Sequence, residues 1–134
     1  MSQFNIYARK LDDAFKAARS EYNTAFRALQ EAQQASRDAN AWRPGDSAEE
    51  KQVRTARAAL KLHDAEATFN EVSTRVWDNF KATRRTIRAE LNIAPSYRLT
   101  VLLRPSDAHQ KDVLEANREV ILTLARLGEL IIDL

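Results

Sequence analysis

Residues 84–134 decide the fold, and they read RRTIRAELNIAPSYRLTVLLRPSDAHQKDVLEANREVILTLARLGELIIDL. The spacing of apolar residues changes twice here, from a helical period to strict alternation and back. The first change falls at Pro95, which disfavours helical backbone at the residue before it. The alternating apolar residues are Tyr97, Leu99, Val101 and Leu103. We therefore expect a half-buried strand at 97–103, ending before Pro105.

A third helix is expected after this strand, from Ser106 or Asp107 to about Leu127, because Gly128 suits the position that follows a helix. Its apolar face would consist of Val113, Ala116, Val120, Leu124 and Leu127. Residues 129–133 fit either a continued helix or a second strand. A lone strand has no partner, which favours two parallel strands joined by a right-handed crossover.

Two long helices are expected before this segment. Apolar residues at alternating four- and three-residue spacing predict one helix over 4–40 and another over 47–91. The segment 42–46 between them contains Pro-Gly, a turn signal, and Ser47 with Glu50 fits a capping box. A short connection makes the two helices antiparallel and coiled-coil-like. The expected fold is therefore mainly α, with a helical hairpin over 1–91 and a small strand–helix–strand cap over 92–134 packed on the end of the second helix.

Composition excludes several classes of function. The 134 residues include no cysteine, so disulfides, thiolate metal sites and cysteine nucleophiles are excluded. His63 and His109 have no companions at metal-ligand spacing, and no Gly-rich phosphate loop is present, so we expect no metal, no cofactor and no catalytic residues. No apolar run approaches the ~20 residues of a membrane span, and the N-terminus is unlike a secretory signal. A cytoplasmic protein without a membrane partner is expected.

Basic residues are concentrated between residues 75 and 104, a segment that contains seven Lys and Arg residues and two acidic residues. Four of them, together with an aromatic residue at the edge, share one stripe of the second long helix, which we expect to lie off its core face. The stripe consists of Lys81, Arg84, Arg85, Arg88 and Trp77. Such an array suits nucleic acid, with cations on phosphates and Trp77 stacking on a base. The alternative is a solvated basic face with an arginine over Trp77.

The tail resembles valyl-tRNA synthetase over about residues 85–132. The resemblance rests on IRAELNIAP at 87–95, LLR at 102–104, EANR at 115–118 and LTLARL at 122–127. In that family this segment follows the anticodon-binding helical bundle, ends a helix, forms a small strand–helix–strand layer and leads to a coiled-coil arm that touches tRNA. The resemblance implies the same layer here and a tRNA partner. It carries no catalysis and does not extend to the hairpin, and no HIGH-like or KMSKS-like signature is present.

Two functions follow from these observations. The first is a non-catalytic tRNA- or RNA-associated helical module. The second is a structural or protein-interaction module, such as a phage-type accessory protein, in which the hairpin forms a homo-oligomer or binds another protein. Trp42, at the expected tip of the hairpin, would either cap the helix ends or serve as an exposed anchor for a partner.

Overall fold

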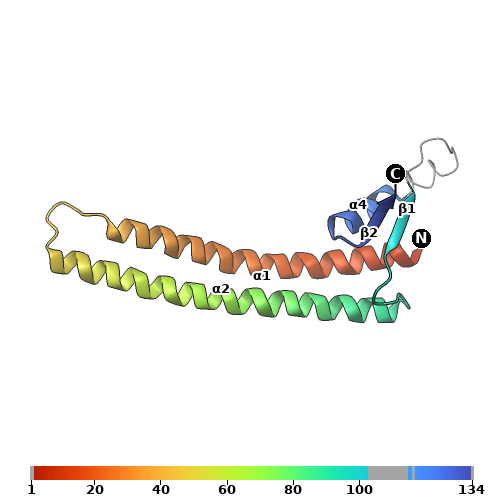
Figure 1. Ribbon diagram of the computed structural model, residues 1–134, viewed down its shortest axis with the longest axis horizontal. Coiled ribbons are helices and arrows are strands. Elements are labelled where there is room, and N and C mark those ends of the chain that lie inside the picture. The colour runs from red at the N-terminus through yellow and green to blue at the C-terminus, as the bar shows by residue number, and fades with distance from the viewer. Residues whose placement is uncertain (1, 103–114, 116, 134) are drawn as a thin grey trace. The chain divides into compact units, whose positions relative to one another are not determined.

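The computed structural model describes residues 2–102, 115 and 117–133 and shows a mainly α protein (Figure 1), as expected from the sequence. The elements are α1 (Ser2–Asn40), α2 (Ala48–Glu90), β1 (Leu99–Leu102), α4 (Arg118–Arg126) and β2 (Leu130–Asp133). The two long helices begin and end within two residues of the expected positions. No helix among these described residues is both long enough and apolar enough to cross a membrane.

The chain forms two compact units. The terminal unit consists of Met1–Lys16 and Phe80–Leu134, and the hairpin unit consists of Ala17–Asn79. The division into a hairpin over 1–91 and a cap over 92–134 stays a prediction.

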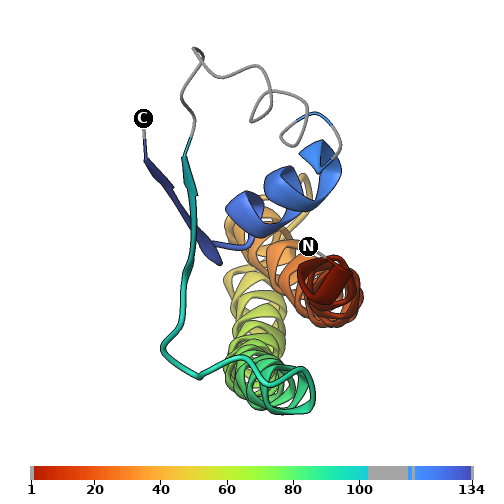
Figure 2. The ribbon, with the colours of Figure 1, turned by 90° about the vertical axis from the view of Figure 1, so that its right-hand side faces the viewer.

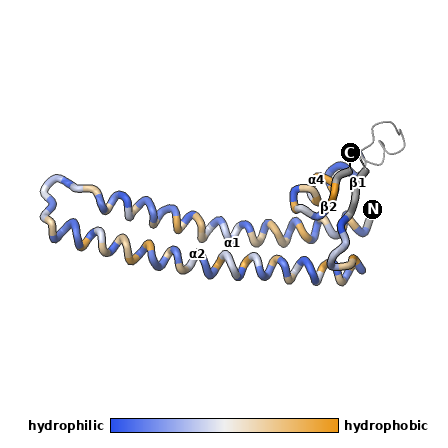
Figure 3. Tube along the Cα trace, in the orientation of Figure 1, coloured by the Kyte–Doolittle hydropathy of each residue, from blue (hydrophilic) through white to orange (hydrophobic). Residues whose placement is uncertain are grey.

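The hairpin unit is built from α1 residues 17–40 and α2 residues 48–79, which pack side by side. Apolar positions recur along both helices between hydrophilic ones (Figure 3). Buried residues include Ala18, Leu29, Ala39 and Val76, and an aromatic cluster consists of Tyr22, Phe26, Phe69 and Trp77. Small residues let the helices approach closely, while the aromatic rings fill the space between them. The seam between the helices therefore supplies the core of this unit.

Hydrogen bonds fix the turn between α1 and α2. Arg54 donates to both carboxylate oxygens of Asp46, at 2.9 and 2.8 Å, and to the carbonyl oxygens of Ala39 and Ala41. These bonds satisfy carbonyl groups at the end of α1, where the helix itself offers no donors. The Arg54 side chain and the backbone amide of Arg43 lower the pKa of Asp46 to about 2. The backbone amide of Glu50 donates to Ser47 Oγ at 3.1 Å. This is one of the two hydrogen bonds of the expected capping box, the one that the serine side chain accepts.

Trp42 lies in this turn and is 62% exposed. The Lys51 ammonium group lies 4.2 Å from the centre of its ring. This cation–π contact covers part of the indole ring.

A two-stranded parallel sheet forms in the terminal unit. Leu99 of β1 lies opposite Leu130 of β2, and Leu102 lies opposite Asp133. This pairing confirms the expected strand–helix–strand unit and rejects a helix continued through residues 129–133. The first part of the expected third helix lies outside the described residues, and α4 is its described portion. Figure 2 shows β1 and β2 side by side, with α4 between the sheet and the first turns of α1.

The core of the terminal unit joins segments that are far apart in the sequence. Its buried residues are Tyr7, Ala8, Leu11, Ile87, Ile93 and Leu124. They come from the first turns of α1, the last turns of α2, the segment after α2, and α4. At the edge of this core, Arg126 Nη2 of α4 lies 2.6 Å from Asp12 Oδ1 of α1. The termini of the chain thus fold together around one apolar cluster.

Candidate nucleic-acid interface

The C-terminus of α2 determines the surroundings of the predicted basic stripe. Asn92 has a φ of 57°, in the left-handed region that asparagine adopts more readily than most residues. Its amide donates to Ala89 O at 3.2 Å, and the amide of Ile93 donates to Arg88 O at 2.8 Å. These two bonds form a Schellman motif, with Ile93 buried against the core. The motif turns the chain so that residues 94–97 pass beside the Arg88 side chain.

A second Schellman motif ends α4. Gly128 has a φ of 72°, its amide donates to Ala125 O at 3.0 Å, and the Glu129 amide donates to Leu124 O at 2.8 Å. Glu129 therefore occupies a fixed position just before β2. Its side chain enters the interior from there and is 6% exposed.

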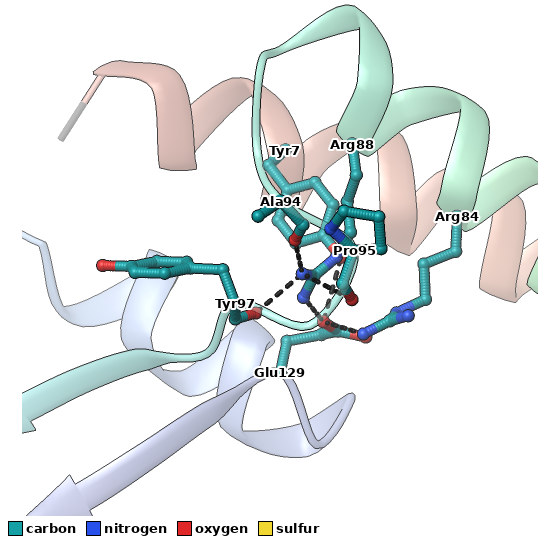
Figure 4. A network of polar contacts seen from close by, with 7 residues as sticks. All are labelled: Tyr7, Arg84, Arg88, Ala94, Pro95, Tyr97 and Glu129. Atoms are coloured by element: carbon teal, nitrogen blue, oxygen red, sulfur yellow. Dashed lines mark hydrogen bonds and ion pairs between the residues drawn. The ribbon is translucent and has the colours of Figure 1, made fainter.

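Arg88 is buried, with 2% of its surface exposed, and its guanidinium group is surrounded by acceptors (Figure 4). Nε donates to Tyr7 Oη at 2.8 Å, and Nη2 donates to Glu129 Oε2 at 2.5 Å. Nη1 donates to the carbonyl oxygens of Ala94, at 2.9 Å, and Tyr97, at 2.7 Å. A buried guanidinium is tolerated only when its donors are paired in this way. Arg88 thus joins α1, α2, the segment 94–97 and the residue before β2.

Glu129 also accepts hydrogen bonds from Arg84 and Tyr7. Arg84 Nε and Nη2 lie 2.5 and 3.0 Å from its two carboxylate oxygens, and Tyr7 Oη donates to Oε2 at 2.9 Å. The paired contacts of Arg84 form the bidentate geometry that arginine makes with carboxylates. We call Tyr7, Arg84, Arg88 and Glu129 the buried ion cluster. It has no buried side-chain nitrogen or oxygen left without a hydrogen bond among the described residues.

The environment of the buried ion cluster changes two acidic pKa values. Burial by itself would raise the pKa of Glu129, but hydrogen bonds from Arg84, Arg88 and Tyr7 outweigh it and hold the pKa below its ordinary value. Burial raises the pKa of Tyr7 above its ordinary value, and its bond to Glu129 adds to that effect. Glu129 is therefore ionised and Tyr7 is neutral at neutral pH. Both states suit a structural network of donors around one carboxylate.

The predicted basic stripe divides into two groups. Lys81 and Arg85 are exposed, and neither makes a hydrogen bond or an ion pair with any residue that the structure describes. Arg84 is partly buried and paired, and Arg88 is fully buried. The expectation that Arg88 lies off the core face is wrong, because the segment from Asn92 onward folds back over this side of α2. Nucleic-acid binding by the stripe itself stays a prediction.

Trp77 belongs to the hairpin unit and is partly buried. Its ring centre lies 5.8 Å from that of Tyr22, with the two ring planes at 52°. Packing within the hairpin therefore occupies part of the surface that base stacking would need.

Sequence reasoning missed Tyr7 and Glu129, the two residues that pair with the arginines. A signal for Glu129 was present, because it is an acidic residue between Gly128 and the apolar run at 130–132. A charge next to a buried strand needs a partner. Within the described residues, no group of three or more His, Cys, Asp or Glu could hold a metal ion.

Comparison with curated proteins confirms the resemblance seen in the sequence. Over 46 residues the chain is 65% identical to the valine–tRNA ligase of Nitratidesulfovibrio vulgaris. This match covers 34% of the chain and 5% of the ligase. No family model matches the chain, and no solved structure matches it. About one third of this protein is thus similar to a short segment of a valine–tRNA ligase.

Proposed function

We propose that the chain is a non-catalytic tRNA- or RNA-associated module. The observation that carries this proposal is the 65% identity over 46 residues to an enzyme whose name states that it acts on tRNA. The chain spans about one twentieth of that enzyme, so the ligase reaction is not transferred to it. An RNA-associated role without catalysis is consistent with a cytoplasmic protein.

The exposed cations of the terminal unit are the proposed contacts. Lys81 and Arg85 lie one turn apart on α2, so their side chains project from neighbouring positions on one face. Arg98, in the segment before β1, is also exposed. When cations that are not already paired with carboxylates bind phosphates, they displace the counterions condensed on the nucleic acid. This release favours association and makes it dependent on salt.

The buried ion cluster has a supporting role in this proposal. Arg84 and Arg88 are already paired with Glu129, so they are not phosphate ligands in this structure. They hold the segments after α2 against the helix that carries Lys81 and Arg85. Trp77 is left out of the proposed contact surface because Tyr22 packs against it.

The proposal is tested by titrating labelled tRNA with the full chain and following fluorescence anisotropy at several salt concentrations. The double variant Lys81→Glu/Arg85→Glu is expected to bind at least about tenfold more weakly. Loss of two phosphate contacts is also expected to reduce the slope of log K against log salt by roughly 1.5.

The matched control is Arg19→Glu/Arg27→Glu, which makes the same charge change at exposed positions of the hairpin unit. It is expected to keep most of the affinity. If the wild type does not bind tRNA at low salt, or if both double variants lose affinity equally, the proposed contact surface is wrong.

A second candidate function, a helical interaction module, is favoured by apolar residues exposed on the hairpin unit. Leu60 is 66% exposed, Trp42 62% and Val53 51%. Exposed single apolar residues are common, but Leu60 and Val53 are seven residues apart and share one face of α2. Light scattering of the full chain at increasing concentration tests this function, which predicts a mass above that of a monomer.

A further inference from the structure

α2 carries a second apolar stripe on the side that faces away from α1. We call Val53, Ala56, Leu60 and Ala67 the outer stripe, and all four are exposed. The partly buried apolar residues of the same part of α2 are Ala58, Leu62, Ala65 and Phe69. At 100° per residue, the two sets lie about 180° apart around the helix. The hairpin seam therefore leaves the outer stripe without a partner among the described residues.

The spacing of the outer stripe is that of a coiled-coil seam. Val53, Leu60 and Ala67 are separated by seven residues, and Ala56 and His63 occupy the intermediate positions of the same repeat. Small residues beside one leucine allow another helix to approach closely. A complementary helix could bury this stripe over residues 53–70.

Two charged residues beside the outer stripe indicate which charges a complementary helix would carry. Arg57 and Asp64 lie one heptad apart on the same side of the stripe, and both are exposed. Neither forms an ion pair or a hydrogen bond with a residue that the structure describes. By contrast, Arg75 in the same unit is paired with Glu21 and Glu71. Arg57 and Asp64 are thus available to a partner that carries the opposite charges at the same spacing.

A second copy of this chain has those charges. In an antiparallel pair of helices, residues on the same side of each seam face one another, so Arg57 of each copy lies opposite Asp64 of the other. Because such a pair is two-fold symmetric, the contact between Arg57 of one copy and Asp64 of the other forms twice. The same register places Leu60 beside His63 of the other copy and Ala56 beside Ala67.

We propose that two copies of the chain associate through the outer stripe of α2, antiparallel, with reciprocal Arg57–Asp64 ion pairs. This inference rests on the second candidate function and is independent of RNA binding, because Lys81 and Arg85 belong to the terminal unit. The interface contains few large side chains, so the dimer is weak and forms in the micromolar range.

The test is sedimentation equilibrium of the full chain with a charge exchange. Arg57→Asp and Asp64→Arg are each expected to weaken the dimer about tenfold, because like charges then face one another at both contacts. An equimolar mixture of the two variants is expected to restore association, since opposite charges then meet at both contacts of the mixed dimer. The double variant Arg57→Asp/Asp64→Arg is expected to dimerise like the wild type.

Leu60→Gln tests the apolar part and is expected to weaken the dimer by at least about tenfold. Its matched control is Leu122→Gln, at a 55% exposed position of the terminal unit, which is expected to leave the dimer unchanged. Circular dichroism checks that the helices persist in every variant.

Three results would overturn the inference. They are a monomer at millimolar concentration, a dimer indifferent to Leu60→Gln, and single charge variants whose mixture does not associate. A dimer that ignores all these changes would show an interaction module using another face. None of these outcomes bears on tRNA binding, which is measured separately with Lys81→Glu/Arg85→Glu.

Discussion

The two units of this protein use charged residues in opposite ways. In the terminal unit, Arg88 and Glu129 are almost completely buried and join segments from both ends of the chain. In the hairpin unit, the core is an apolar and aromatic seam, and the ion pair of Arg75 with Glu21 lies on the surface. The terminal unit therefore places its ion cluster in the interior, whereas the ion pairs of the hairpin unit lie at the turn, where Arg54 binds Asp46, and on the surface.

This difference explains why one arginine-rich stripe has two roles. A helix that packs only against another helix keeps its charges in solvent. Where the chain folds back over the helix, a charge on that side must be paired or removed. Glu129 supplies the pairing for Arg84 and Arg88, and Lys81 and Arg85 stay in solvent.

The largest expected effect is that of Glu129→Ala, which leaves Arg88 buried without its carboxylate. Removing one partner of a buried ion pair costs about 3–5 kcal/mol of unfolding free energy. Hydrogen exchange should rise in residues 92–98 and 118–133 while the hairpin unit stays protected. Glu119→Ala, an exposed change on α4, is the control, and equal exchange in both variants would contradict the structural role of Glu129.

Acid is expected to weaken the terminal unit through the same carboxylate. The pKa of Glu129 is lowered by folding, so its stabilising contribution is complete above the ordinary value of 4.5 and is lost as the pH falls through the lower folded value. The wild-type unfolding free energy should therefore decrease below about pH 4.5. Glu129→Gln should flatten this decrease, and an unchanged slope would exclude Glu129 as its source.

The corresponding group in the hairpin unit is Asp46, whose pKa falls from 3.8 to about 2 on folding. Its contribution to the unfolding free energy is lost as the pH falls through these two values. Asp46→Asn should therefore change the pH dependence of the unfolding free energy only below about pH 4. Urea unfolding of the wild type and Asp46→Asn side by side measures this.

A smaller effect is expected at the glycines. Gly128 and Gly45 have φ values of 72° and 85°, and an added Cβ would meet no atom within 4 Å at either site. Alanine should therefore cost only the backbone strain, about 1–2 kcal/mol in each case. Gly128→Ala should also increase exchange at Glu129, whereas Gly45→Ala should affect only the turn. Identical changes in hydrogen exchange in both variants would show that Gly128 does not position Glu129 in the buried ion cluster.

Most of the fold could be predicted because its signals are local. Heptad spacing predicted α1 and α2, Pro-Gly predicted the turn, and Pro95 predicted the end of α2. A second strand was expected at 129–133 because a single strand needs a partner, and β2 occupies Leu130–Asp133. Each of these features is encoded within a few residues of the place where it acts.

The buried ion cluster could not be predicted in this way. Glu129 is 41 residues from Arg88, and Tyr7 is 81 residues from it. A helical projection relates residues of one helix to each other and says nothing about a segment that folds back from elsewhere. A helical projection therefore groups Arg88 with Lys81 and Arg85, although Arg88 is buried and the other two are exposed.

The most direct test of the division of the basic stripe is urea unfolding of Arg88→Met beside Arg85→Met. Methionine keeps an unbranched apolar chain and removes the charge in both variants. Arg88→Met is expected to lose about 3–5 kcal/mol of unfolding free energy, because Glu129 and Tyr7 lose their donor, and Arg85→Met to change it by no more than about 0.5 kcal/mol. Equal losses in the two variants, or a larger loss for Arg85→Met, would contradict the division of the basic stripe into a buried structural pair and an exposed pair.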